Sequence, residues 1–381
     1  MKRVAFIDVA RGLAVLLMIL IHSFNSWVDP ALRGSATYRL AQHLGGFAAP
    51  GFLLLAGVGL GFKFQSAVRR GRSLAESRRS ALHRGALIFL LAYVFRFQEW
   101  LLAGAKGAAA QLLKVDVLNC IGASLMLVAL VGLRGGARAL RPGAEPPQLD
   151  RPWRALAWAS FFALATPLIW KMPLPGGYWQ ALTGYVGGDP KWSAFPLFPW
   201  AAYAFAGLAV GVLWSAAAGS DRPALGTSVL RVTLTSLALA LLGWGLHTAL
   251  VPYVGDASNA SQGWTSPARF AYRLGAFLVA TGLLYVLEQA RWVPLWETVR
   301  RMGQASLLIY WVHVDLVYGR FSRGWRRELS LGETALGLLL LLIAMALLGW
   351  ARTSGYLKLP SWLSLRPGRR AAGSDSGAGR G

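Results

Sequence analysis

Long apolar blocks separated by short polar segments dominate the pattern of this chain. Each block holds about 17 to 25 residues, and an α-helix rises about 1.5 Å per residue, so each block can cross the roughly 30 Å hydrocarbon core of a bilayer. The chain contains ten such blocks, at residues 5–27, 40–64, 81–97, 115–133, 153–170, 195–214, 229–251, 269–288, 302–318 and 334–350. The pattern therefore predicts an all-α, polytopic membrane bundle of about ten transmembrane helices.

The composition agrees with a membrane environment. Hydrophobic residues make up 55% of the chain and charged residues 14%, whereas about a quarter of the residues in a soluble domain are charged. The first block is too long for the apolar core of a signal peptide, so we expect it to remain in the fold. The loops leave no room for a soluble domain. Residues 1–355 are therefore predicted to form one transmembrane domain, and the basic, Gly/Ser-rich segment 356–381 a disordered cytoplasmic tail.

The formal charge of +23 would suit a nucleic-acid partner, but the Lys and Arg residues lie between the apolar blocks. Cytoplasmic loops of membrane proteins are enriched in these residues. Segments 63–84 and 134–154 are rich in them, whereas 172–194 and 252–268 together hold one Lys. We therefore predict a cytoplasmic N-terminus, the cell (inner) membrane as location, and the bilayer, not nucleic acid, as partner. The basic segment 320–327 would lie outside, so either it is exceptional or the helix count differs by one.

Three ionisable residues lie on one helical face of the first block. Asp8 and Arg11 are about 300° apart, and Arg11 and His22 about 1100°, or roughly 20° beyond three full turns. Ionisable side chains are costly in hydrocarbon unless they are paired or hydrated, so this face is expected to point into the bundle. Asp8 and Arg11, at i and i+3, are expected to pair. The alternative is that this pair only anchors the cytoplasmic end of the helix.

His22 lies about 21 Å of helix beyond Asp8, in the outer half of the bilayer. A histidine titrates near neutral pH and can act as a general base or as a nucleophile that accepts an acyl group. We therefore predict that His22 is catalytic. The alternative is a core histidine whose hydrogen bonds are satisfied within the bundle.

Two further histidines extend this prediction. His43 begins the second block on the same outer side and is expected to meet His22 at the outer mouth of a cavity. His313 shares a polar stripe with Ser306 and Tyr310 in an otherwise apolar block, so it is expected to line the same cavity. For His43, a purely structural role is equally open.

The remaining polar residues give weaker signals. Asp116 lies at the start of the fourth block and Asp189 precedes the sixth, and either carboxylate can orient a histidine or bind a hydroxyl or amine. Helix capping and solvation explain both equally well. The single cysteine, Cys120, is expected to be an inert packing residue. His83 and His247 belong to no pattern, and the five histidines lack the spacing of metal ligands, so we predict no metal site.

Four motifs follow one another along the apolar blocks. They are Ile7-Asp8-Val9-Ala10-Arg11-Gly12-Leu13-Ala14 followed by Met18 and His22; Ala-Pro-Gly-Phe-Leu-Leu-Leu-Ala-Gly at 49–57; Asp-Val-Leu-Asn-Cys-Ile-Gly at 116–122 with Phe-Pro-Leu-Phe-Pro-Trp at 195–200 and Gly207; and the stretch 303–313 that ends at His313. In this order they resemble bacterial membrane proteins related to the catalytic domain of heparan-α-glucosaminide N-acetyltransferase, within the transmembrane acyltransferases.

The resemblance implies transfer of an acetyl group from cytoplasmic acetyl-CoA to a glucosamine amine on the other side of the membrane. In the lysosomal enzymes of this family an asparagine takes the place of His22, and a catalytic histidine precedes the second helix. His43 is the nearest counterpart of that histidine here. Related bacterial proteins act on cell-surface glycans, so a sugar or glycan is the expected acceptor.

We therefore predict a membrane-embedded O- or N-acyltransferase. His22 and His43 are the candidate catalytic residues, and Asp8, Arg11 and His313 are the candidate contacts of acetyl-CoA, whose phosphates the basic loops would attract. Direct transfer and a covalent acyl-histidine both remain open.

Two other function classes and one assembly also remain open. The first is a proton-coupled transporter or flippase, which the clustering of polar residues without an inverted repeat disfavours. The second is a structural subunit of an envelope complex. The glycine-rich run 57–61 permits close packing within one chain or between two, so a homodimer is also open.

Overall fold

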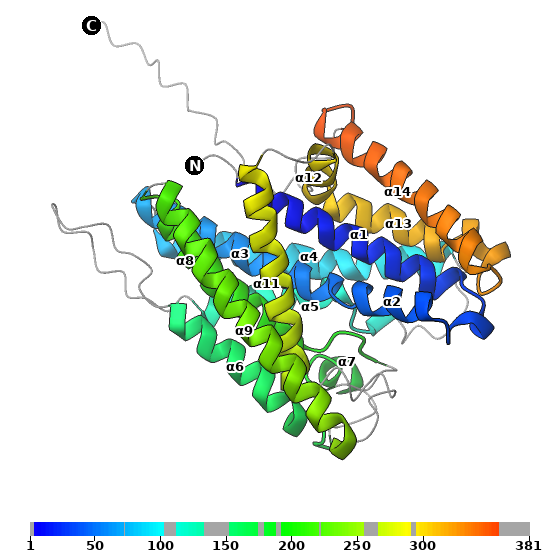
Figure 1. The fold of residues 1–381 in the computed structure, drawn as a ribbon, viewed down its shortest axis with the longest axis horizontal. Coiled ribbons are helices and arrows are strands. Elements are labelled where there is room, and N and C mark those ends of the chain that lie inside the picture. Colours follow the sequence, from blue (N-terminus) through cyan, green and yellow to red (C-terminus); the bar gives the residue numbers. More distant parts are fainter. Residues whose placement is uncertain are drawn as a thin grey trace, which may run out of the picture.

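The computed structural model describes residues 4–71, 73–102, 112–132, 152–173, 179–187, 192–220, 222–254, 266–290 and 295–357. Its elements are α1 (Ala5–Trp27), η1 (Pro30–Leu32), α2 (Ala36–Gly45), α3 (Ala48–Arg69), α4 (Leu74–Leu102), α5 (Val117–Val131), α6 (Pro152–Ile169), α7 (Gln180–Thr183), α8 (Leu197–Ala217), α9 (Arg222–Val254), α11 (Pro267–Gln289), α12 (Trp296–Gln304), α13 (Ser306–Tyr318), η4 (Arg320–Trp325) and α14 (Leu331–Thr353). The predicted all-α class is confirmed (Figure 1). Asp189 and the predicted tail beyond residue 357 lie outside the described residues.

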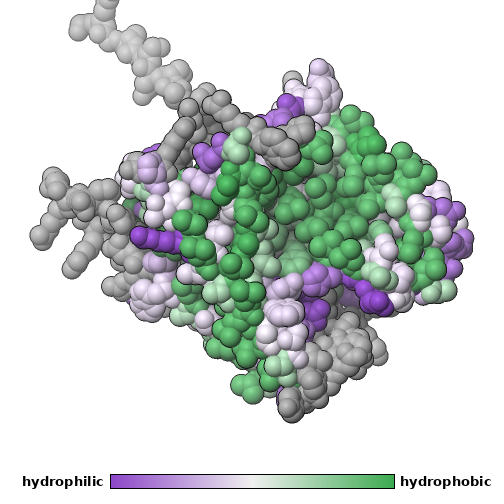
Figure 2. Space-filling view, in the orientation of Figure 1, coloured by the Kyte–Doolittle hydropathy of each residue, from purple (hydrophilic) through white to green (hydrophobic). Residues whose placement is uncertain are grey.

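The long helices agree with a multi-pass membrane protein. Seven helical stretches in the described ranges are long and apolar enough to cross a bilayer: α1, α2 with α3, α4, α8, α9, α11 and α14. The other three predicted blocks form α6 and the shorter apolar helices α5 and α13. On α14, Leu336, Leu340 and Leu347 are about 60% exposed, as expected for a surface that faces lipid, and Figure 2 shows a broad apolar surface over this helix.

Two predicted helices are each broken in two. Block 40–64 is divided between α2 and α3, because α2 ends at Gly45 and the chain turns through Gly46 and Phe47. A side chain at Gly46 would crowd the Arg273 guanidinium, 2.9 Å from the position of a Cβ. Pro50, which has no N–H to donate, falls in the first turn of α3, where that loss is tolerated. Block 302–318 is likewise divided, at Ala305, between α12 and α13.

The short helix α12 lies outside the apolar spans and carries an ion-pair cluster. Glu297 accepts hydrogen bonds from Arg300 at 2.7 Å and from Arg301 at 2.7 Å. The Arg300 hydrogen bond is the main reason that the pKa of the Glu297 carboxyl falls to about 2. Both arginines are therefore partly neutralised on this helix.

Helix α1 is the centre of the bundle and contacts α2, α3, α11, α12, α13 and α14. Helix α8 packs along α3, and glycines permit their close approach. A Cβ on Gly57 would collide with the Ala204 carbonyl, and one on Gly61 with the backbone at Gly211. The glycine-rich run therefore packs within the chain, whereas Gly59 has open space beside it and faces a cavity.

The bundle has two ends, which we call proximal, where α1 begins, and distal, where α1 ends. The connection between α13 and α14 lies at the distal end, because the Asp29 amide donates to the Leu329 carbonyl at 3.0 Å and the Arg327 amide to Ser26 at 2.9 Å. The basic segment 320–327 is thus at the end opposite to the start of the chain, as the ten-helix arrangement predicts. Arg326 closes this turn through a 2.6 Å hydrogen bond to the Gly319 carbonyl.

Candidate functional site

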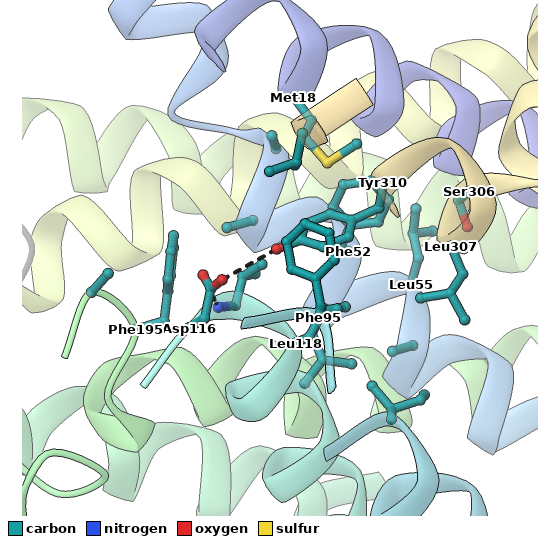
Figure 3. Close-up of a pocket in the computed structure, with 18 of the residues that line it drawn as sticks. Met18, Phe52, Leu55, Phe95, Asp116, Leu118, Phe195, Ser306, Leu307 and Tyr310 are labelled. Carbon is teal, nitrogen blue, oxygen red and sulfur yellow. Dashed lines mark hydrogen bonds between the residues drawn. The ribbon is translucent and has the colours of Figure 1, made fainter. Parts of the chain in front are cut away.

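A cavity of about 1290 Å³ runs along the inside of the bundle between α1, α3, α4, α5 and α13. Helices α1 and α4 run from the proximal to the distal end, and α3 and α5 return, so each wall contributes residues to both ends. Apolar side chains line the middle of the cavity, including Met18, Phe52, Leu55, Leu118 and Leu307 (Figure 3). The cavity therefore has a polar region at each end and an apolar middle section between them.

The proximal part of the cavity is basic. Its lining residues are Arg11 on α1, Lys63 on α3, and Ser80, His83 and Arg84 on α4. Lys63 donates to the Ser80 hydroxyl at 2.8 Å, and Arg84 lies within electrostatic range of Lys63 and Arg11. Clustered cations of this kind suit a ligand with several phosphates.

The distal part mixes both signs of charge. Its lining residues include Asn25, Gln42, Arg96, Glu99, Lys114 and Asp116. Asp116 caps α5 through a capping box with Asn119, so the expected capping role is present. The same carboxylate also accepts a hydrogen bond from the Tyr310 hydroxyl at 3.2 Å (Figure 3). It pairs with Arg96 at 3.4 Å. Asp116 therefore faces the cavity as well as its own helix.

His22 lines the cavity between these two regions and contacts His313 behind it. His313 is not among the described residues that line the cavity, so the expectation that it lines the cavity is wrong. The His22 Nδ1 and His313 Nε2 atoms are 2.9 Å apart, and the rings stack at 8°. His313 is fully buried, and its Nδ1 lies 2.8 Å from the Ile309 carbonyl. A carbonyl can only accept, so Nδ1 of His313 carries a proton. In a neutral His313 ring, Nε2 must then accept, and the donor is the Nδ1–H of His22.

This chain of hydrogen bonds fixes the tautomer of His22. With the proton on Nδ1, the Nε2 atom of His22 keeps its lone pair. Such a nitrogen can take a proton from a hydroxyl or an amine, or attack a carbonyl carbon. The pair thus resembles a base held by an orienting partner, the arrangement that activates proton transfer in many enzymes.

A family model described as heparan-α-glucosaminide N-acetyltransferase, catalytic, matches residues 3–254 of the 381. The chain belongs to this family. Among curated proteins no match was found. As a member of the family, the chain is a membrane enzyme of the acetyltransferase type. The matched residues include Asp8, Arg11, His22 and His43, whereas His313 comes after them.

In this family member, Asp8 and Arg11 form the predicted pair, with Arg11 Nη1 3.0 Å from Asp8 Oδ1. The second Asp8 oxygen accepts from the Gln304 amide at 3.0 Å, next to the break between α12 and α13. Asp8 is buried, and only Arg11 of the two lines the cavity. The pair therefore joins α1 to Gln304 and also presents a guanidinium to the basic region.

The structure does not bring His43 to His22. His43 lies on α2, is exposed, and its Nε2 is 3.0 Å from the Tyr272 hydroxyl of α11. It also packs edge-on against Phe47, with ring centroids 5.7 Å apart. His43 is not among the described residues that line the cavity. The expected meeting at the cavity mouth is wrong, because α2 is a separate helix that turns this side chain toward α11.

The face of α4 that lines the cavity, including Arg96 and Glu99, was not predicted from the sequence. Ser80, Arg84, Leu87, Ile88, Phe95, Arg96 and Glu99 all line the cavity. Among the polar ones, Ser80 and Arg84 are four residues apart and Arg96 and Glu99 are three apart, so the members of each pair lie on the same side of the helix. A search for polar residues at this spacing, instead of a search centred on histidines, could have found them.

In the described part of the chain, no group of three or more His, Cys, Asp or Glu residues lies close enough together to hold an ion. Cys120 is buried in α5, where its thiol lies 3.9 Å from the Ser124 hydroxyl.

Proposed function

We propose that this protein transfers an acetyl group from acetyl-CoA, bound at the proximal, cytoplasmic end, to the amine or hydroxyl of a sugar that enters from the distal, outer side. One observation carries the proposal. A single cavity joins a basic proximal region to a mixed polar distal region, and His22 lies between them. Two polar substrates can thus approach the imidazole of His22 from opposite sides of the membrane.

The donor fits the proximal region by charge. The phosphates of acetyl-CoA would lie against Arg84, Lys63 and Arg11, because guanidinium and ammonium groups form charge-assisted hydrogen bonds with phosphate oxygens. Arg11 and His22 are about 16 Å apart along α1. The thin pantetheine arm would extend through the apolar middle section of the cavity and bring the thioester to His22.

The acceptor fits the distal region. Asp116, Glu99, Asn25 and Gln42 offer oxygen atoms to sugar hydroxyls or an amine, and the aromatic ring of Phe195 also lines this part of the cavity. The carboxylates favour an amine, whereas the amide groups suit either acceptor. N- and O-acetylation are therefore both compatible with the proposal.

The transfer step then follows from the tautomer of His22. The acceptor nitrogen or oxygen attacks the thioester carbonyl carbon, and its proton passes to the His22 Nε2 atom. The tetrahedral intermediate collapses with cleavage of the C–S bond, and the CoA sulfur takes the proton from Nε2. The products are the acetylated sugar and CoA thiol, and His22 returns to its starting tautomer, held by His313.

Acetyl-CoA binding tests the proposal. Arg84→Gln is expected to weaken equilibrium binding of acetyl-CoA to purified protein by about 10- to 100-fold, the effect of losing one charge-assisted hydrogen bond of about 1.5–3 kcal/mol. Arg300→Gln is the matched control, since this arginine lies on α12, is paired with Glu297 and does not line the cavity. It should bind like wild type. Failure of the folded wild type to bind acetyl-CoA, or equal binding by Arg84→Gln, would refute the proposed donor site.

A further inference from the structure

A second group of cations lies at the distal end, outside the cavity. We call it the distal basic cluster: His43 on α2, His247 on α9, and Arg269, Tyr272 and Arg273 on α11. The His43 ring bonds to the Tyr272 hydroxyl at 3.0 Å. The charged neighbours that act on both His43 and His247 are Arg269 and Arg273. Cationic or ionisable side chains from three helices thus lie within electrostatic range of one another.

One member of this cluster, Arg273, is unusually buried for a cation within a membrane helix. Arg273 is only 7% exposed, and Arg269 is half-buried. Two arginines and two histidines within electrostatic range of one another give this region a positive potential, which would stabilise a bound anion. The mechanism proposed above uses none of these side chains.

The surroundings of the cluster indicate what kind of anion fits. The neighbouring faces of α2 and α9 expose Leu40 (58%), Leu44 (39%), Trp244 (57%), Leu246 (46%) and Leu250 (47%). Figure 2 shows a hydrophilic strip between broad apolar surfaces, in the area where Figure 1 draws α2 and the distal part of α11. The polar group of a ligand bound here would contact the cations, and its apolar part would contact the exposed apolar side chains. A lipid phosphate has this chemistry, whereas a fully water-soluble anion does not use the apolar flanks.

The cluster also adjoins the distal mouth of the cavity. Gly46 lines the cavity, and the Arg273 guanidinium lies 2.9 Å from the position of a Cβ on this glycine. Gln42 and Gly45, on the same helix as His43, line the cavity as well. A headgroup held by the cluster is therefore next to the distal region described above.

We propose that the distal basic cluster binds the phosphate of a membrane lipid, with Arg273 and Arg269 as its main contacts and the lipid chains against α2 and α9. A role for this lipid site in presenting a lipid-linked sugar acceptor to the cavity rests on the function proposed above. The lipid-binding site itself does not depend on acetyl transfer.

Binding of short-chain lipids to purified protein in detergent tests this inference. The probes are dioctanoyl phosphatidic acid, dioctanoylglycerol, which lacks the phosphate, and inorganic phosphate. Wild type is expected to bind the lipid phosphate at least tenfold more tightly than either of the other two. Arg273→Gln and the more exposed Arg269→Gln should each weaken that binding about tenfold or more. Arg320→Gln, an exposed distal arginine outside the cluster, is the control and should bind like wild type.

Several results would overturn the inference. Equal binding of dioctanoylglycerol would show that only the apolar flanks bind, and equal binding of inorganic phosphate would show that the ligand is a soluble anion. Unchanged lipid binding in a folded Arg269→Gln protein would show that the distal basic cluster does not bind the lipid phosphate, even if Arg273→Gln failed to fold. Acetyl-CoA binding is measured on the same samples, so a failure here is distinct from a failure of the proposed transferase function.

Discussion

Replacing His22 with glutamine is expected to lower the rate of acetyl transfer by about 100- to 10,000-fold, the usual contribution of a positioned general base. Glutamine fills similar space, but its amide cannot take a proton from the acceptor. The loss should appear in kcat, while binding of acetyl-CoA remains close to wild type, because the phosphate contacts lie at the proximal end. Transfer from radiolabelled acetyl-CoA to a panel of amino sugars and glycans in detergent measures both quantities.

Ser23→Ala is the matched control for His22→Gln. Ser23 follows His22 on α1, is fully buried, and its hydroxyl has no hydrogen-bond partner among the described residues. Loss of this hydroxyl should leave transfer unchanged, so a fall in activity would point to general damage of α1. A His22→Gln protein with wild-type kcat, together with an inactive His43→Gln protein, would move the chemistry to His43 and contradict the cavity-based mechanism.

Replacing His313 with leucine is expected to lower kcat by about 10- to 100-fold, since losing a buried hydrogen bond costs about 1–3 kcal/mol and each 1.4 kcal/mol corresponds to tenfold in rate. His313 acts as a positioning residue. Without its Nε2 acceptor, the His22 ring can rotate or place its proton on the wrong nitrogen. KM for acetyl-CoA should stay within about twofold of wild type, because the basic region that holds the phosphates is unchanged.

The conservative variant His313→Gln separates positioning from a general structural role. A glutamine oxygen can accept the Nδ1 proton of His22, so part of the lost kcat should return. Matched losses of kcat and thermal stability in both variants, with no recovery in His313→Gln, would show that His313 only supports the packing between α1 and α13 and would contradict the positioning role.

Local periodicity explains which parts of the fold were predictable. The ten apolar blocks and the face shared by Asp8, Arg11 and His22 depend on residues near one another in sequence, and the structure confirms the Asp8–Arg11 pair. The helix breaks at Gly46 and Ala305 depend on tertiary packing, such as the approach of Arg273 to Gly46, which hydropathy does not record.

Contacts between residues far apart in the chain could not be predicted from the sequence. His22 and His313 are 291 residues apart, and although both were expected in one cavity, only the structure shows their 2.9 Å contact and the tautomer that follows from it. Arg84 was expected to attract the phosphates from a basic loop, because an arginine near the end of an apolar block looks like a loop charge, whereas it lies within α4; Arg96 of the same helix was not singled out. His43 was misplaced because the extra turn between α2 and α3 changes the direction in which it points.

Transfer across a sealed membrane tests the central claim most directly. Purified protein is reconstituted into vesicles, its orientation is determined from the accessibility of an N-terminal tag, and radiolabelled acetyl-CoA and a sugar acceptor are supplied on opposite sides. The account predicts acetylated sugar only when acetyl-CoA is on the side of the N-terminus and the acceptor is on the other side. Transfer that requires both substrates on the same side would contradict a cavity that joins the two faces at His22.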